Sequence, residues 1–294
     1  MREGEILSLF NVRFLMVYKY LRYYAKFILR LFTRNIQING LENFPKDKPV
    51  LLASTHPNSF FDAIVQACML ERPLHPLARG DAFKNPLADK FLSSINMMPI
   101  FRISEGKENM GKNDETFNRS LKVFQKNGVV LIFSEGICVH QKELLPLKKG
   151  TSRMALQSWQ LGIDLMVVPI ANNYDSFSKF GKNITINIGK PITTSDFPAA
   201  SNSMEGIYPT DFNKLLTERL KPLIDPNLPK PKWYWQLFYG LGWLINFPVY
   251  LSLAALAKSK TRRTVFYDSV LYGLILFTLP FYWLIIGLIS WWLS

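Results

Sequence analysis

Short apolar runs alternate with longer amphipathic stretches through the first 225 residues of the chain. Runs with the length and composition of strands lie at residues 36–39, 50–53, 72–79, 129–133, 165–170 and 184–188. Helical patterns fall between them, near residues 60–70, 83–94, 116–126, 151–161 and 210–223. This alternation predicts an α/β fold with a mixed central sheet flanked by helices, with ligands expected at the carboxyl ends of strands.

The amino-terminal stretch has a different pattern, in which cations recur among apolar residues. Residues 1–34 hold seven Lys/Arg against two Glu, and Lys19, Arg22, Lys26 and Arg30 follow helical spacing. We expect a basic amphipathic helix over about residues 9–32, lying in a membrane interface with its cations on anionic headgroups. The alternative is a helix packed on the domain with a solvated charged face.

The carboxyl-terminal stretch is apolar over long distances. Residues 233–257 and 269–294 contain no charged side chain, and each is long enough to cross ~30 Å of hydrocarbon. Two full spans would put the basic loop between them across the membrane from the rest of the chain, whereas positive loops favour the cytoplasm. Because Pro248 and Pro280 lie near the middle of each segment, we favour re-entrant hairpins over two spans.

These patterns divide the chain into three predicted units. Residues 1–35 form the membrane-interface helix, residues 36–225 the globular domain, and residues 226–294 a Pro/Lys linker followed by membrane-embedded helices. The net charge of +13 and the 48% hydrophobic content indicate an anionic membrane surface as partner, not nucleic acid. Two cysteines make no disulfide framework, so we expect the globular part in the reducing cytoplasm.

Polar residues that can do chemistry follow directly after three of the apolar runs. His56 lies in the turn after the strand at 50–53, and Asp62 lies one turn into the next helix. An imidazole there can take a proton from an alcohol, and a carboxylate can fix its tautomer. Arg102 ends the apolar run at 97–101, and Glu135-Gly136 follows the strand at 129–133. Strand ends can share one face of a sheet, so these residues could converge.

Each of these residues also has a structural interpretation. Ser59 and Asp62 have the spacing of a helix capping box, with aspartate in place of the usual Glu or Gln. Arg102 could be a surface arginine at a strand end, and Glu135-Gly136 an ordinary turn. No metal-ligand cluster of Cys and His, Walker loop or GxGxxG motif occurs in the sequence.

Four segments, in order, resemble the motifs of the glycerolipid acyltransferase superfamily. They are His56-Pro-Asn-Ser-Phe-Phe-Asp62, Pro99-Ile-Phe-Arg102, Phe133-Ser-Glu-Gly136 and Val168-Pro-Ile170. The resemblance covers about residues 36–195. Two departures stand out: five residues, not four, separate His56 from Asp62, and Ser134 replaces the usual proline. The longer spacing looks like a branch similar to glycerol-3-phosphate acyltransferases.

The resemblance implies a role for each motif residue. His56 would deprotonate the acceptor hydroxyl, which attacks the thioester of acyl-CoA or acyl-carrier protein (acyl-ACP), and Asp62 would orient His56. Arg102 would hold the acceptor phosphate, and Glu135 and Gly136 would shape the acceptor pocket. Lys148 and Lys149, at a predicted helix start, could add phosphate contacts. This chemistry requires no metal and no cofactor beyond the acyl donor.

The function expected from the resemblance is acylation of 1-acyl-glycerol-3-phosphate to phosphatidic acid by a membrane-bound enzyme with its catalytic domain on the cytoplasmic side. Glycerol-3-phosphate is the nearest alternative acceptor. A non-phosphate acceptor such as an aminolipid would make Arg102 dispensable. A non-catalytic membrane-anchored scaffold on the same fold is the alternative from another functional class.

Overall fold

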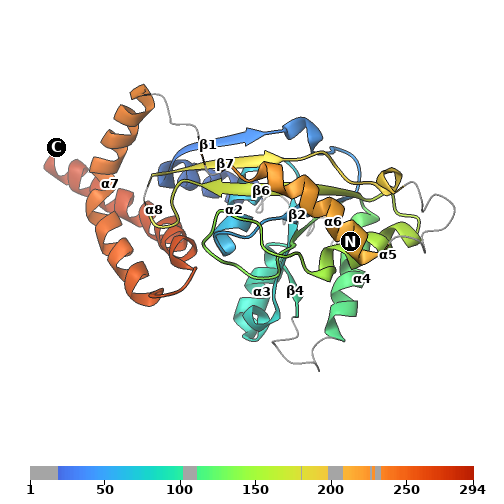
Figure 1. Ribbon diagram of the computed structural model, residues 1–294. Coiled ribbons are helices and arrows are strands. Elements are labelled where there is room, and N and C mark those ends of the chain that lie inside the picture. The colour runs from blue at the N-terminus through green and yellow to red at the C-terminus, as the bar shows by residue number, and fades with distance from the viewer. Residues whose placement is uncertain (1–18, 102–110, 180, 198–207, 226, 229–232) are drawn as a thin grey trace.

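The computed structural model describes residues 19–101, 111–179, 181–197, 208–225, 227–228 and 233–294. A central sheet carries helices on both faces, and a pair of long helices stands at one end of it (Figure 1). The predicted class, an α/β fold with a mixed central sheet flanked by helices, is therefore confirmed.

The sheet has seven strands in the order β1-β7-β6-β2-β5-β3-β4. Their bounds are β1 Thr33–Asn39, β2 Val50–Ser54, β3 Leu74–Arg79, β4 Met98–Ile100, β5 Val129–Phe133, β6 Met166–Tyr174 and β7 Lys182–Ile188. Neighbouring strands are parallel except β6 and β7, which are antiparallel. The carboxyl ends of β2, β5 and β6 therefore meet at one edge, where Ser54 is in register with Phe133 and Ile170.

The apolar runs are continuous because the central strands are covered on both faces. In β2, Val50 and Leu52 belong to one core cluster, and Leu51 and Ala53 belong to the other. The helix at residues 19–32, α2 (Phe60–Met69) and α8 (Tyr267–Leu293) contribute to the first cluster. The second cluster contains residues of α4 (Lys112–Phe124), α5 (Lys149–Gln160) and α6 (Pro209–Leu220).

Within the helical stretch expected near residues 83–94, the helix itself begins at the Asn85-Pro86 boundary. A 3-10 turn, Gly80–Phe83, precedes α3 (Pro86–Ser94). Pro86 lies in the first turn of α3. The side chain of Asn85 caps this helix by accepting hydrogen bonds from the amides of Leu87 and Ala88. No residue of α3 is buried.

The C-terminal segments form two continuous helices, α7 (Trp233–Lys260) and α8, which pack against each other. Each helix runs through its proline, so the predicted reversal of each segment at Pro248 and Pro280 is wrong. A proline removes one backbone hydrogen bond, which is compatible with a kinked but continuous helix. Among the described helices, α8 is the one long and apolar enough to cross a membrane, by length and composition.

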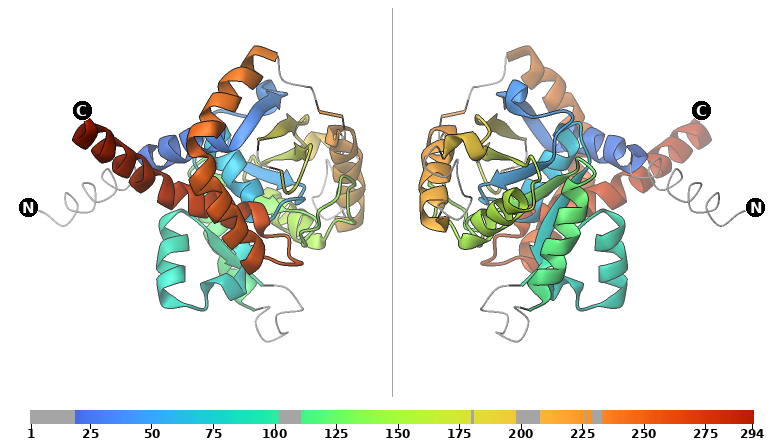
Figure 2. Two further views of the ribbon diagram at one scale, coloured as in Figure 1. Left: turned by 90° about the vertical axis from the view of Figure 1, so that its left-hand side faces the viewer. Right: turned by 90° about the vertical axis from the view of Figure 1, so that its right-hand side faces the viewer.

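The first half of α8 packs on the globular domain, whereas its outer end projects away from the sheet (Figure 2). Leu271, Tyr272, Ile275 and Leu279 are buried in the same core cluster as residues of α2 and of the helix at 19–32. The hydroxyl of Tyr272 donates to the carbonyl of Ala25 at 2.6 Å. The divisions at residues 35 and 226 stay predictions, but the described parts of all three units share one core.

Part of the predicted basic helix lies within the described chain. Residues 19–32 are helical, and residues 9–18 of the prediction fall outside the described residues. Tyr20, Tyr23 and Phe27 are exposed aromatic side chains on this helix. The guanidinium of Arg22 donates to the carbonyl of Glu71 at 2.8 Å and also bonds that of Leu70, so one cation fastens the helix to the end of α2.

Candidate active site

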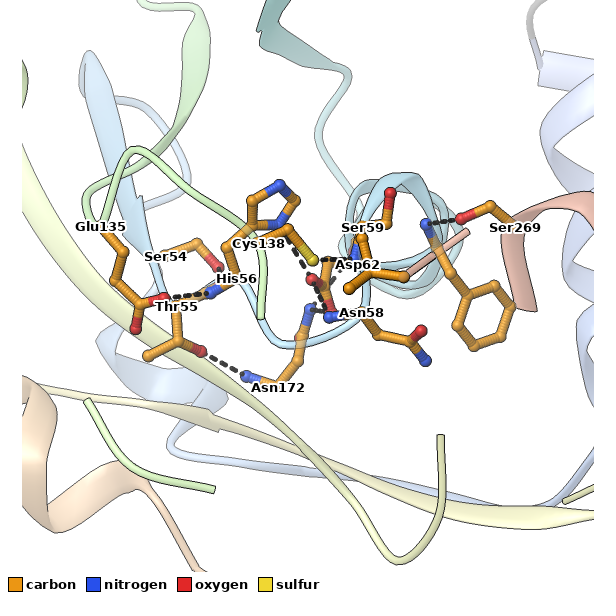
Figure 3. Close-up of polar contacts among 12 residues, drawn as sticks. Ser54, Thr55, His56, Asn58, Ser59, Asp62, Glu135, Cys138, Asn172 and Ser269 are labelled. Carbon is orange, nitrogen blue, oxygen red and sulfur yellow. Dashed lines mark hydrogen bonds and ion pairs between the residues drawn. The ribbon is translucent and has the colours of Figure 1, made fainter. Parts of the chain in front are cut away.

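The sequence-predicted pair of His56 and Asp62 is brought together at the carboxyl edge of the sheet. Nδ1 of His56 lies 3.0 Å from Oδ2 of Asp62, which stands in the first turn of α2 (Figure 3). The carboxylate is fully buried, and the His56 side chain is 13% exposed. The ring and the acid therefore face each other, with the imidazole as the member that solvent reaches.

Four hydrogen-bond donors converge on the Asp62 carboxylate. Oδ2 accepts from the Asn58 amide at 2.8 Å in addition to His56, and Oδ1 accepts from the Tyr174 hydroxyl at 2.7 Å and the Asn172 side chain at 3.2 Å. Because a carboxylate accepts hydrogen bonds, it fixes the proton of neutral His56 on Nδ1 and leaves the lone pair on Nε2.

The capping-box interpretation of Asp62 is wrong. Ser59 is the N-cap of α2, but its side chain makes no capping hydrogen bond, and Asp62 bonds the amide of Asn58 instead. Ser59 has φ 54 and ψ −142, an uncommon conformation for a non-glycine residue. The three residues from Pro57 to Ser59 thus form a turn that accommodates the five-residue interval between His56 and Asp62.

Two further contacts fix the orientation of His56. Its ring stacks on Phe133 at the end of β5, with centroids 3.8 Å apart and planes 16° apart. Its amide donates to Oε2 of Glu135 at 3.4 Å. Nε2 has no hydrogen-bond partner among the described residues, so the ring offers this nitrogen to a ligand at the strand edge.

The Glu135-Gly136 turn follows β5, and the Glu135 carboxylate lies beside the pair, where it accepts from the His56 amide. Glu135 is 4% exposed, and burial raises its pKa to about 7. The negative charge of Asp62 acts in the same direction, while the amides of Leu145 and His56 oppose it. Gly136 has φ +70, and a Cβ there would lie 2.7 Å from Cγ of Lys148, so this turn requires glycine.

The two predicted lysines lie at the rim of this region. Lys148 is the N-cap of α5, and its amide donates to the Ser134 carbonyl at 2.8 Å, which joins the helix to the Glu135 turn. The side chains of Lys148 and Lys149 are exposed. Arg102 lies outside the described residues; the preceding Phe101 is held at the end of β4 by two hydrogen bonds with Asn113.

Sequence reasoning missed Asn58, Asn172 and Tyr174. Asn172 and Tyr174 belong to the last part of β6, beyond the apolar run at 165–170 from which that strand was predicted. A signal was present, since polar side chains at the carboxyl end of a buried strand are candidates for the site. Their distance in sequence from Asp62 left no local pattern to connect them to it.

The chain resembles known acyltransferases over the part that contains this site. Residues 35–173 match the family model described as Acyltransferase. The chain is 29% identical over 185 residues to 1-acyl-sn-glycerol-3-phosphate acyltransferase of Bacillus subtilis, covering 62% of this chain and 85% of that protein. It is 22% identical over 223 residues to 1-acyl-sn-glycerol-3-phosphate acyltransferase alpha of Mus musculus, covering 71% and 74%.

Among solved structures, the chain is similar to the 1-acyl-sn-glycerophosphate acyltransferase PlsC of Thermotoga maritima. The TM-score is 0.48 and the sequence identity 16%, over 74% of this chain and 80% of that one.

Proposed function

The chain belongs to the glycerolipid acyltransferase superfamily, and on that premise we propose that it acylates 1-acyl-glycerol-3-phosphate to phosphatidic acid. The acyl donor is a thioester, acyl-CoA or acyl-ACP. The observation that carries the proposal is the buried Asp62 carboxylate 3.0 Å from Nδ1 of His56, with Nε2 open at the carboxyl edge of the sheet. The choice of acceptor is supported by the names of the relatives from Bacillus subtilis and Mus musculus.

In the proposed reaction, Nε2 of His56 takes the proton of the acceptor hydroxyl as its oxygen attacks the thioester carbonyl carbon. The tetrahedral intermediate collapses, the carbon–sulfur bond breaks, and the leaving thiolate takes the proton back from the imidazolium. Asp62 stabilises the imidazolium and holds its orientation without itself becoming protonated. The products are the new ester and the free thiol, so His56 returns to its starting state.

The surrounding residues would bind the acceptor. A guanidinium pairs with a phosphate through two parallel hydrogen bonds, a role we assign to Arg102. Lys148 and Lys149 would add positive charge at the start of α5, where the helix amides also favour anions. Glu135 and Gly136 would form the wall of the acceptor pocket next to His56.

We place this reaction at a membrane, with the catalytic domain on the cytoplasmic side. The apolar α8 and the exposed aromatic side chains of the helix at 19–32 support the placement. The net charge of +13 favours the anionic leaflet in which the acceptor and product reside.

The test uses the full chain in lipid nanodiscs, with labelled acyl-CoA or acyl-ACP and a panel of acceptors. We expect transfer to 1-acyl-glycerol-3-phosphate, a loss of at least a thousandfold in His56→Ala, and retained activity in His75→Gln. His75 is a suitable control because its Nδ1 bonds the Val129 carbonyl, away from the pair. Activity of His56→Ala near wild type would overturn the mechanism, and preference for an acceptor without phosphate would overturn the substrate.

A further inference from the structure

A buried ion pair connects α8 with the sheet beneath the catalytic turn. Lys182, the first residue of β7, pairs with Asp268, in the first turn of α8, and their side chains are 0% and 1% exposed. Nζ of Lys182 also lies over the rings of Phe32 and Phe61, at 5.6 and 5.8 Å from their centroids. Neither charged residue belongs to the motifs of the proposed active site. Burying a charge without a partner is strongly unfavourable, so each residue requires the other.

A third residue links this ion pair to the proposed catalytic pair. The side-chain amide of Asn58 donates to Oδ2 of Asp268 at 2.7 Å, and the backbone amide of Asn58 donates to Oδ2 of Asp62 at 2.8 Å. That oxygen of Asp62 is the one that contacts Nδ1 of His56. Consecutive contacts therefore run from His56 through Asp62, Asn58 and Asp268 to Lys182.

The start of α2 depends on α8 in a second way. Ser59 supplies no side-chain cap, and the amide of Phe61 instead donates to Oγ of Ser269 at 3.0 Å. Figure 3 shows Asp62 lying between His56 on one side and Ser269 on the other. Two adjacent residues of α8 thus bond the chain on either side of Ser59: Asp268 accepts from Asn58, and Ser269 accepts from Phe61.

Besides its local bonds to Asp62, this turn is held by contacts from other segments: the Ser59 amide donates to Sγ of Cys138 at 2.9 Å, and Asp268 and Ser269 supply the rest. Ser59 adopts φ 54, which a non-glycine residue keeps only where surrounding contacts impose it. Asn58 is fully buried, so displacement of its amide would leave a polar group without a partner in the core. The contacts from α8 are therefore suited to holding the Asn58 amide against Asp62.

We propose that Asp268, paired with Lys182 and bonded to Asn58, is a positioning residue through which the docked α8 sets the geometry of His56 and Asp62. The expected change in kcat rests on the proposed function, whereas the expected change in the contact between His56 and Asp62 does not. Because α8 is the candidate membrane helix, catalytic competence depends on the seating of the first turn of that helix on the domain.

The test compares Asp268→Asn with a control that weakens α8 docking elsewhere. Leu279→Ala removes a buried apolar side chain from α8 about three turns beyond Asp268. At saturating donor and acceptor, we expect Asp268→Asn to lower kcat at least tenfold, with both KM values within about twofold of wild type. Leu279→Ala is expected to lower Tm while keeping kcat within twofold.

A double-mutant comparison separates positioning from simple loss of stability. We expect Lys182→Met to lower kcat by a factor similar to that of Asp268→Asn, and the double variant to lose no more than either single one. Multiplicative losses in the double variant would overturn the linkage. If Asp268→Asn fails to fold, Asn58→Ala removes the bond to Asp268 while its backbone amide remains, and kcat within twofold of wild type in that variant would overturn the proposal.

A spectroscopic readout keeps the inference testable without turnover. The chain has three histidines, so ¹⁵N-histidine labelling resolves the Nδ1–H of His56. We expect this resonance to shift or disappear in Asp268→Asn and to remain in Leu279→Ala. If wild-type protein is inactive on every acceptor but the resonance still shifts in Asp268→Asn, the positioning role is supported and the proposed function is overturned. An unchanged resonance in active Asp268→Asn would overturn the positioning role alone.

Discussion

The hydroxyl of Tyr174 donates a 2.7 Å hydrogen bond to Oδ1 of Asp62, the oxygen of the carboxylate that does not contact His56. Tyr174 is fully buried, and burial together with the charge of Asp62 raises the pKa of the phenol well above its ordinary value. The phenol is therefore a permanent donor. Tyr174 and Asn172 hold one oxygen of Asp62, so the other is aimed at the imidazole.

Replacing Tyr174 by phenylalanine should lower kcat, although Tyr174 lies outside the four sequence motifs. The change leaves a buried carboxylate oxygen short of one donor, which costs about 1–3 kcal/mol of stability. We expect a roughly tenfold fall in kcat from the altered orientation of Asp62. Tyr272→Phe is the matched control, since it removes another buried phenol hydroxyl, bonded to the Ala25 carbonyl. Equal kcat values in the two variants would contradict the orienting role of Tyr174.

The raised pKa of Glu135 predicts a pH-dependent effect of Glu135→Gln on stability. The pKa is about 7 in the folded protein, against 4.5 for an ordinary glutamate. Between these values the folded state holds a proton that the unfolded state has lost, so this group's contribution to stability falls as pH rises through the window. A glutamine side chain does not titrate, so it does not lose stability over this pH window. The Tm of Glu135→Gln relative to wild type should therefore be higher at pH 8 than at pH 5.

Thermal unfolding at pH 5, 6, 7 and 8 measures this difference. Glu143→Gln is the control, because Glu143 is exposed in the segment that follows the same strand. Its Tm difference from wild type should stay constant over the range. A constant difference for Glu135→Gln as well would show that the buried carboxyl does not titrate as described.

Two glycines with similar positive φ allow the cost of backbone strain to be compared with the cost of a steric clash. Gly136 has φ +70 and Gly162 has φ +74, but a Cβ at Gly162 would meet no atom within 4 Å. We expect Gly162→Ala to cost about 1–2 kcal/mol from the backbone alone, with unchanged kcat. Gly136→Ala should lose more stability and also activity, because its Cβ displaces Lys148 and the Glu135 turn. Urea unfolding with parallel rate measurements compares them; equal losses would show that the contact with Lys148 is unimportant.

The seating of α8 predicts which side of the membrane the basic loop faces. Thr261 is buried, and Nε2 of His140 lies 3.3 Å from the Val265 carbonyl oxygen, so the loop contacts the catalytic domain. Residues 280–294 include no buried residue, and this outer part rises only about 21 Å, less than the ~30 Å of hydrocarbon. We therefore expect the loop to stay on the side of the catalytic domain, although neither helix reverses at its proline.

A cysteine placed at Lys260, with Cys68→Ala and Cys138→Ser as background, would report this topology in sealed vesicles. An impermeant maleimide should label it from the same side as a cysteine at Lys84, which is exposed on the catalytic domain. Labelling of the two positions from opposite sides would instead favour two full spans.

Local patterns sufficed for much of the fold and for the centre of the candidate site. Buried strands such as Val129–Phe133 are visible as apolar runs, and the turn after Val50–Ser54 places His56 and Asp62 close together through local geometry. Contacts between distant segments were not predictable. Asp268 directly precedes the uncharged stretch at 269–294, and its partners Lys182 and Asn58 are 86 and 210 residues away.

The flat stacking of His56 on Phe133 has a consequence for the order of events in the proposed reaction. Because the imidazole stacks on the Phe133 ring and bonds the Asp62 carboxylate, it cannot rotate between two positions. The same nitrogen, Nε2, must therefore act on both the incoming alcohol and the departing sulfur. Because the alcohol attacks the thioester directly in the proposed reaction, with no acyl-enzyme intermediate, donor and acceptor must both be bound beside this one nitrogen. Steady-state kinetics should give the intersecting lines of a ternary complex, and not the parallel lines of a ping-pong scheme.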